Sequence, residues 1–295
     1  MRTYSIKELE NFSGTKAHTI RIWEQRYNLL SPKRTPTGIR YYNDEDLKKI
    51  LAIAVLLKSG FKISKVAKLS KEELNLELNK IEDTKADDDT KYEKYINSLL
   101  AAGVLFNEQE FDHHFNQALQ KYDLLEIYEN IIYPLLIKIG TMWGKDDMNP
   151  LQEHFISNLI RQKLLKAVDD LPEPQSERSI VLFLPERETH EIGLLLAQFL
   201  LKKCGVKTYY FGQQTPIINL INFISDKNIK EAVGFIFYSQ GKEKFLKLFK
   251  MLDEKCPNTT FYWGGGKAIF DTLKISERHQ IFNSIEDFIN LLIKK

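Results

Sequence analysis

One stretch near the N-terminus constrains the fold of this chain more than any other. Residues 19–27 read T-I-R-I-W-E-Q-R-Y, a helical pattern with arginines on one side. Residues 31–42 follow as S-P-K-R-T-P-T-G-I-R-Y-Y, a basic turn with Pro and Gly that ends in aromatic residues. A helix for a groove, followed by a basic wing for the flanking phosphates, is how a small domain reads duplex DNA. The sequence therefore predicts a winged DNA-binding domain.

The charge distribution points the same way. The chain has 295 residues, enough for two or three domains, and a net charge of only +2. Residues 1–70 hold nine Lys and five Arg against six acidic residues, or +8, which leaves 2 − 8 = −6 for the rest. A basic head on an acidic body is typical of a DNA-binding module joined to something else, although solvated lysines can also cluster by chance.

Local signals divide this head into helices and a wing. Ser5 with Glu8 predicts a capping box for a first helix, Thr15 a cap for the second, and Asn43 a cap for a third. Ile20, Trp23 and Tyr27 share one face of the second helix and should pack inward. The candidate DNA-contacting residues lie on its other face and in the wing: His18, Arg21, Gln25, Arg26, Lys33, Arg34, Arg40 and Tyr41. The alternative is a small helical domain with solvated basic residues.

Residues 3–75 resemble the winged helix-turn-helix of the MerR family of bacterial transcription regulators. The resemblance rests on T-I-R-x-W-E-x-R-Y, on P-x-R-T-x-x-G-x-R-Y-Y and on the helix that follows. It implies that Arg21, Arg26, Arg34, Arg40 and Tyr41 contact double-stranded promoter DNA. It also implies a homo-oligomer, a dimer or a tetramer, that distorts its promoter and so gains specificity at bases it does not touch. The expected DNA-binding domain is 1–75.

The rest of the chain divides into two further regions. After an acidic linker at 76–91, residues 92–172 have apolar residues at spacings of three and four, which predicts a four-helix bundle with a kink at Pro134. A linker at 173–179 leads to residues 180–295. There, short β-branched and aromatic runs at 179–184, 206–211, 233–238 and 260–263 alternate with helical stretches. This alternation predicts a parallel α/β sheet covered on both faces, with ligands at the carboxyl ends of its strands.

The first of these strands ends in a loop with metal-ligand chemistry. Glu188, His190 and Gly193 form E-x-H-x-x-G between strand and helix. A His at this edge can bind a metal while a neighbouring carboxylate orients its ring, and Gly193 permits close approach of a bulky group. A lone E-x-H is also compatible with a His that only lines the start of a helix.

The wider pattern resembles the cobalamin-binding fold, a flavodoxin-like sheet. It consists of E-x-H-x-x-G, then G-V-K-T-Y-Y-F-G, Ser239 after the third strand and Gly264-Gly265-Gly266 after the fourth. The resemblance implies that His190 is the lower ligand of the cobalt and Glu188 its partner. It also implies that Ser239, Gly264 and Gly265 line the slot for the nucleotide tail.

The helical region adds a separate motif. Trp143, Glu153 and His154 form W-x(9)-E-H, which resembles the bundle over the upper cobalamin face in cobalamin-sensing MerR-type regulators. An indole can pack over an adenosyl group and a carboxylate can hydrogen-bond its ribose, so the implied cofactor is adenosylcobalamin. By itself, Trp143 would fit a core aromatic residue equally well.

Together these features predict a DNA-binding regulator, a repressor and not an enzyme. Its oligomeric state and DNA affinity would be controlled by cobalamin bound between bundle and α/β domain. Three departures from the family pattern leave alternatives open: Ser239-Gln240-Gly241, Arg187, and Gly144 where light-sensing members have a His. One alternative is a MerR-type regulator whose degenerate pocket serves assembly or another effector. Another is a corrinoid methyl carrier, in which the basic domain would have no role.

Cysteine content and apolar runs indicate in which cell compartment the protein resides. Cys204 and Cys256 lie far apart within apolar patterns, which argues against a disulfide framework or a zinc site. We find no apolar run near the roughly 18 residues that a membrane span requires, and no signal peptide at the N-terminus. We therefore expect a cytoplasmic protein without a membrane partner.

Overall fold

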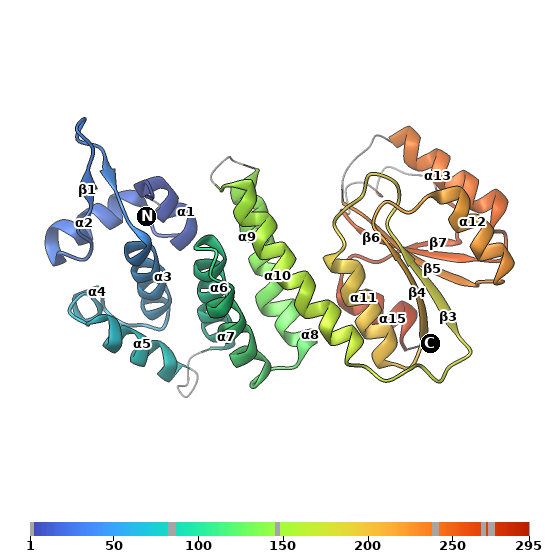
Figure 1. Cartoon of the computed structure of the whole chain (residues 1–295), viewed down its shortest axis with the longest axis horizontal. Coiled ribbons are helices and arrows are strands. Elements are labelled where there is room, and N and C mark those ends of the chain that lie inside the picture. Colours follow the sequence, from blue (N-terminus) through green and yellow to red (C-terminus); the bar gives the residue numbers. More distant parts are fainter. Residues whose placement is uncertain are drawn as a thin grey trace. The chain divides into compact units, whose positions relative to one another are not determined.

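The computed structural model describes residues 3–81, 87–144, 148–237, 242–266, 270 and 275–294. The chain divides into two compact units, residues 1–160 and 161–295. Figure 1 labels the elements of both units, and each unit is described here by itself.

The first unit begins with a small winged helical domain. Its elements are α1 (Ile6–Ser13), α2 (Ala17–Tyr27), β1 (Lys33–Arg34), β2 (Arg40–Tyr41), α3 (Asp44–Lys58), α4 (Ile63–Val66) and α5 (Lys71–Lys80). The capping box at Ser5 and the cap at Asn43 are present as predicted, and Asn43 in fact forms a full capping box with Asp46. The predicted cap at Thr15 is wrong, because α2 begins after Lys16. The carboxylate of Glu10 instead accepts a hydrogen bond from the backbone N–H of Ala17 at 3.1 Å.

Helix α3 is the central element of this domain. It packs against α1, α5 and α6, so it buries more than one face. Ile53, Val55 and Leu56 are buried together with the expected Leu47, Ile50 and Leu51. A single stripe of apolar residues therefore underestimates how deeply α3 is buried.

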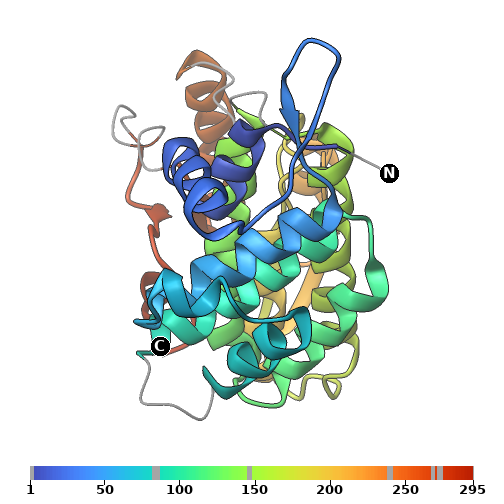
Figure 2. The same ribbon diagram turned by 90° about the vertical axis from the view of Figure 1, so that its left-hand side faces the viewer.

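The remainder of the first unit is a helical bundle, seen beside α3 in Figure 2. It contains α6 (Asp88–Val104), α7 (Glu108–Leu119), α8 (Leu124–Ile127), the π-helix η2 (Tyr128–Ile132), α9 (Tyr133–Trp143) and α10 (Pro150–Asp169), which runs across the division between the units. The linker expected at 76–91 is shorter than predicted, since α5 continues to Lys80 and α6 begins at Asp88, capped by Asp87.

Pro134 shapes the helix around it without ending it. A proline ring has no N–H and clashes with the carbonyl four residues earlier. The backbone accommodates this with the π-helical turn Tyr128–Ile132, in which the N–H of Tyr133 bonds the carbonyl of Tyr128. Helices α8, η2 and α9 consequently follow one another without a break.

The second unit is an α/β domain whose sheet has the order β4-β3-β5-β6-β7. The strands are β3 (Ser179–Phe183), β4 (Lys207–Gly212), β5 (Glu231–Ile236), β6 (Thr260–Gly265) and β7 (His279–Ile281), and each pair is parallel. This is the flavodoxin-like order, in which strands β3 and β5 flank the switch point where ligands bind. The sequence did not predict β7, because three residues carry too little pattern to indicate a strand.

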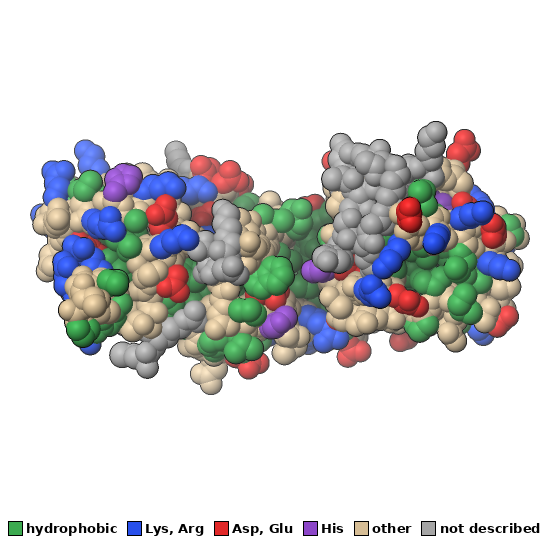
Figure 3. Space-filling view, turned by 90° about the horizontal axis from the view of Figure 1, so that it is seen from above, with side chains coloured by type: hydrophobic (Ala, Val, Ile, Leu, Met, Phe, Trp, Pro, Cys, Tyr) green, Lys and Arg blue, Asp and Glu red, His purple; other side chains and the backbone are tan. Residues whose placement is uncertain are grey.

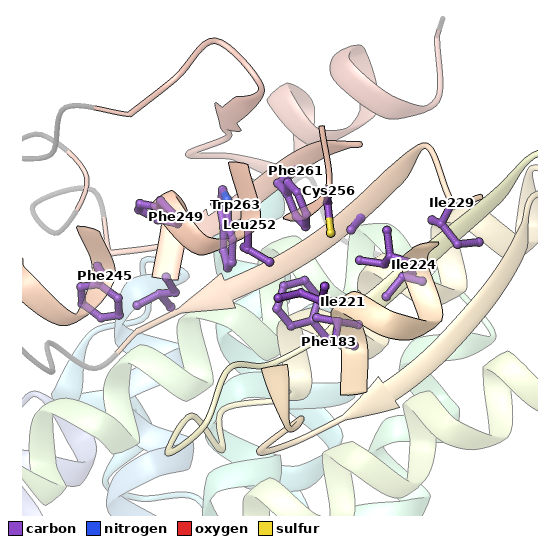
Figure 4. Close-up of a cluster of buried hydrophobic side chains, with 14 of the residues drawn as sticks. Phe183, Ile221, Ile224, Ile229, Phe245, Phe249, Leu252, Cys256, Phe261 and Trp263 are labelled. Carbon is purple, nitrogen blue, oxygen red and sulfur yellow. The ribbon is translucent and has the colours of Figure 1, made fainter. Parts of the chain in front are cut away.

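Helices cover both faces of this sheet, as predicted (Figure 1). They are α11 (Ile192–Lys203), α12 (Ile217–Asp226), α13 (Lys242–Lys255) and α15 (Ile285–Leu292). Figure 4 shows the core beneath α12 and α13, where Phe183 and Phe249 both lie edge-on to Trp263. This core fixes the strands whose carboxyl ends carry the candidate site.

Among the described residues, no helix has both the length and the apolar character needed to cross a membrane.

Candidate functional site

The outward face of α2 carries the first group of candidate residues. His18, Arg21, Gln25 and Arg26 are all exposed, whereas Ile20 is buried and Trp23 and Tyr27 are half-buried. Figure 3 shows Lys and Arg side chains gathered over this end of the first unit. The exposed face of α2 therefore presents cations and hydrogen-bonding groups of the kind that meet phosphates and base edges.

The wing is a short antiparallel hairpin in which Lys33 pairs with Tyr41 and Arg34 with Arg40. Its turn needs Gly38, which has a φ of 82°, a left-handed conformation that a side chain would strain. The guanidinium of Arg34 donates to the carbonyl of Gly38 at 3.1 Å, and Lys33 and Arg34 are exposed. The turn thus holds both cations on the outside of the wing.

Arg40 differs from the other candidates, because it is bound within the domain. Its Nε lies 3.3 Å from the carboxylate of Glu24 on α2, whose side chain is only 7% exposed. Tyr42 donates its hydroxyl to the same carboxylate at 2.5 Å, and burial together with this bond raises the pKa of Tyr42. Arg40 therefore fastens the wing to α2. Sequence reasoning missed Glu24, although an acid within a basic helix was a possible signal.

The loop between β3 and α11 is built around a buried acid. Glu188 has a side chain 3% exposed, and its Oε1 accepts hydrogen bonds from the backbone N–H groups of Thr189 and His190. Its Oε2 accepts from the N–H of Phe237, directly after β5, at 2.7 Å. The side chain thus ties the ends of β3 and β5 together at the switch point of the sheet.

This network also orients His190. The Nδ1 of His190 lies 2.6 Å from Oε1 of Glu188, while 64% of the His190 side chain is exposed. Because Glu188 already accepts three backbone N–H bonds, it acts as the acceptor here too, which places the imidazole proton on Nδ1. The lone pair then lies on Nε2, in the arrangement that a carboxylate gives to a metal-binding histidine.

The glycines of the predicted slot lie against aromatic rings. A Cβ on Gly264 would come within 2.6 Å of Phe235 and 2.5 Å of Phe282, and a Cβ on Gly193 within 3.2 Å of Phe235. Gly265 has a φ of 131°, and a Cβ there would meet the carbonyl oxygen of Ile236 at 1.9 Å. Gly193 and Gly264 therefore permit close packing of the two phenylalanines, which sequence reasoning missed.

These contacts test how well the residues fit a cobalamin. The donor set at His190 and Glu188 fits a lower axial ligand. The nucleotide tail would fit beside Gly193 and Gly264 only after Phe235 and Phe282 had moved. Ser239, also expected in the slot, lies outside the described residues. Arg187 is exposed, with a φ of 69°.

The three candidates of the helical region lie on the bundle surface. Trp143, at the end of α9, is 55% exposed and so is not a core residue. Glu153 and His154, in the first turns of α10, contact each other, with 3.1 Å between the Glu153 carboxylate and Nδ1 of His154. Gln152, in the same turn of α10, is buried and donates to the carbonyl of Val104 at the end of α6. The packed Gln152 fixes the side of α10 on which Glu153 and His154 lie.

A second buried acid follows His190 directly. Glu191 forms an ion pair with Arg161 on α10 and accepts the hydroxyl of Tyr210, on β4, at 3.0 Å. Burial and the Glu191 charge raise the pKa of Tyr210. The start of α11 is thereby fastened to α10 and β4.

Two family models match the chain. Residues 4–73 match the MerR HTH family regulatory protein, and residues 95–166 match the B12 binding domain. The chain is a MerR-type regulator with a B12-binding domain. It is therefore a DNA-binding transcription regulator and not an enzyme, and its residues 95–166 belong to a domain of the cobalamin-binding class.

The curated relatives of this regulator agree with that assignment. The HTH-type transcriptional repressor CarH of Myxococcus xanthus is 28% identical over 98% of this chain and 98% of its own length. CarA, an HTH-type transcriptional repressor of the same organism, is 27% identical over 72% of this chain and 69% of its own length. The HTH-type transcriptional regulator MlrA of Escherichia coli is 38% identical over 23% of this chain and 28% of its own length.

A solved structure supports the fold of about two thirds of this regulator. The monomethylamine corrinoid protein of Methanosarcina barkeri superimposes with a TM-score of 0.58 at 14% identity, covering 68% of this chain and 98% of its own. At this identity the likeness shows only a shared fold.

Proposed function

We propose that this regulator is a repressor whose DNA affinity depends on cobalamin bound through His190. The observation that carries the proposal is the fixed His190 imidazole, held by the buried carboxylate of Glu188 at the switch point between β3 and β5. The repressor activity of CarH and CarA, as their names state it, supports the sign of regulation.

The residues of the α/β domain have separate tasks in this proposal. Glu188 holds the proton on Nδ1 of His190, so that Nε2 would bind the cobalt. Gly193, Gly264 and Gly265, together with Ser239, would hold the nucleotide tail, which would require Phe235 and Phe282 to make room. When bound, the cofactor would supply a cobalt centre, while the protein would supply orientation and exclusion of water.

The helical region would distinguish the upper ligand. The exposed indole of Trp143 offers a flat apolar surface for an adenosyl group. Glu153 would accept hydrogen bonds from its ribose hydroxyls, and His154, 3.1 Å from the Glu153 carboxylate, would orient that carboxylate. We therefore propose adenosylcobalamin as the bound form.

The output is DNA binding by an oligomer in the bacterial cytoplasm. His18, Arg21, Gln25 and Arg26 on α2 meet the groove, while Lys33, Arg34 and Tyr41 on the wing, positioned through Arg40, meet the flanking backbone. A ligand changes DNA affinity only if it binds two assembly states with different affinities. We propose that cobalamin favours the dimer or tetramer that binds DNA.

The decisive experiment is an absorption titration of the full-length protein with adenosylcobalamin, in the dark, followed by removal of the unbound cofactor. The wild type should retain a coloured cofactor, and His190→Ala should lose it. His113→Ala, which changes an exposed His on α7, serves as the control. A wild type that stays colourless at saturating cobalamin would overturn the proposal.

A second candidate is favoured by one observation. Phe235 and Phe282 fill the space beside Gly264, so the pocket of this chain can be degenerate and the second unit can serve assembly alone. The cobalamin titration described above separates the two cases. The sensor retains cobalamin, whereas a degenerate pocket does not.

A further inference from the structure

Ile22 is an apolar side chain on the outward side of α2. It is 44% exposed, although isoleucine is among the residues most often buried in proteins. Within the described residues 3–81, the exposed large apolar side chains are Ile22, Ile39 and Leu76. Ile22 therefore differs from Ile20 on the same helix, which is buried and packs inward.

The surface around Ile22 is polar and carries positive charge. On an α-helix, the surface neighbours of a residue are those three and four positions away. For Ile22 they include His18 in the preceding turn, and Gln25 and Arg26 in the following turn, and all three are exposed. An aliphatic group thus lies among the side chains that we propose meet the groove.

The fold of the domain gives little reason for an isoleucine at this position. Nearly half of the side chain is exposed, and a β-branched residue has a lower helix propensity than Ala, Lys or Glu. A single exposed apolar residue is ordinary on a protein surface. Its place at the centre of the polar face is what distinguishes Ile22 from Leu76, which lies on α5.

The chemistry of the major groove limits what Ile22 can meet there. The base edges present hydrogen-bond donors and acceptors, and the apolar group among them is the C5 methyl of thymine. An isoleucine side chain forms no hydrogen bonds, so against a polar base edge it would displace water without replacing its hydrogen bonds. Contact with a thymine methyl instead removes apolar surface of both partners from water.

We propose that Ile22 determines sequence specificity by packing against the C5 methyl of a thymine. This inference rests on the proposed binding of α2 in the major groove. His18, Gln25 and Arg26 would surround the contact with hydrogen bonds and charge. A symmetric dimer would make one such contact in each half-site of its operator.

The test uses DNA in which uracil replaces thymine, because this change removes the C5 methyl and keeps the base pairing and the O4 acceptor. The full-length protein, with and without adenosylcobalamin, selects tight-binding duplexes from a random pool, and each thymine is then replaced in turn. We expect one position in each half-site at which uracil lowers wild-type affinity about four-fold, since burial of one methyl group contributes a factor of that size. The salt slope should stay the same, because no phosphate contact is lost.

Variants assign the contact to Ile22. Ile22→Ala should bind the thymine and uracil duplexes equally at that position, whereas Ile22→Val keeps a branched apolar side chain and should still prefer thymine. Leu76→Ala, which truncates an exposed apolar side chain of α5, should behave as the wild type. All three substitutions are at exposed positions, so urea unfolding should be that of the wild type.

Two kinds of result contradict this assignment, and they can be told apart. If no uracil lowers wild-type affinity, or if Ile22→Ala keeps the wild-type sensitivity to uracil at every position, the role of Ile22 is wrong while DNA binding stands. If the wild-type protein selects no duplex from the pool, the proposed DNA binding fails together with the role of Ile22.

Discussion

The proposed DNA-reading surface and the His190 loop use charge in opposite ways. On α2 and the wing, Arg21, Arg26 and Arg34 are exposed, and their positions follow from which face of an element they occupy. In the loop after β3, the important charge is Glu188, which is buried and accepts hydrogen bonds from Thr189, His190 and Phe237. Phosphates need only cations at the right place, whereas a metal ligand needs a fixed ring. The second requirement takes a buried partner.

We expect the largest effect, a loss of cobalamin affinity, when the buried partner Glu188 is substituted. Glu188→Gln puts an amide where backbone N–H groups and Nδ1 of His190 all donate, so the imidazole loses its orientation. We expect cobalamin affinity to fall by about 10- to 100-fold, as for other carboxylates behind a metal-binding histidine. The measurement is the absorption titration, with Glu186→Gln on the exposed part of the same loop as control. Unchanged affinity would mean that His190 needs no fixed orientation.

Two arginine variants compare an exposed arginine, Arg21, with Arg40, which forms an ion pair within the domain. Arg21→Ala should weaken DNA binding and lower the salt slope by about 1, with a stability change within about 0.5 kcal/mol. Arg40→Ala should also destabilise the domain, by about 1–3 kcal/mol, because it removes the partner of the nearly buried Glu24. Gel shifts at several salt concentrations and urea unfolding measure the two effects. Equal stability of both variants would remove the distinction drawn for Arg40.

The wing turn gives a smaller effect. Gly38→Ala places a side chain at a φ of 82°, which costs about 1–2 kcal/mol in the left-handed region. The wing should form less often and DNA affinity should fall, while α2 keeps its exposed face. Gly140→Ala is the matched control, since it lies in α9 with open space around its Cβ position. Identical gel shifts for Gly38→Ala and wild type would show that the wing contributes no binding energy.

The smallest effect concerns pH in the core of the α/β domain. Nδ1 of the buried His279 accepts the indole N–H of Trp263 at 2.9 Å, and burial lowers the pKa of His279 despite the nearby Asp253. The folded state therefore binds fewer protons than the unfolded state, whose histidine has a pKa of about 6.5. This contribution to stability is present above that pH and is lost as the pH falls through the lowered folded pKa.

Urea unfolding at pH 7.5 and pH 5 measures that dependence. His279→Asn should reduce the difference between the two pH values, because asparagine does not titrate and its amide oxygen, near the position of Nδ1, can still accept from Trp263. His18→Gln, at an exposed histidine, should leave the difference as in the wild type. His114 also has a pKa lowered by burial, so part of the difference should persist in His279→Asn.

The two regions also differ in how far the sequence predicted them. The faces of α2, the capping box at Ser5, the cap at Asn43 and the turn at Gly38 depend on neighbours in the chain, and the structure contains them as predicted. The alternation of the second half likewise predicted the parallel sheet, because helix and strand periods are local properties. The cap at Thr15 failed since Glu10 reaches α2 from α1.

Contacts between residues far apart in the chain could not be predicted from local sequence patterns. The pair Arg40–Glu24, the bond from Phe237 to Glu188 and the packing of Phe282 on Gly264 join residues far apart in the chain. No periodic pattern carries that information, because it arises only when the sheet and the helices are assembled.

The sequence by itself thus determined which chemical groups this regulator carries: cations on α2 and the wing, which we propose meet DNA, and a histidine beside an acid after β3, which we propose binds a metal. The tertiary structure alone decided how those groups are held. It fastened Arg40 to Glu24, buried Glu188 between β3 and β5, and placed phenylalanines against Gly193 and Gly264. The physical reason is that residue type fixes charge and donor set, while burial and distance depend on which elements pack together.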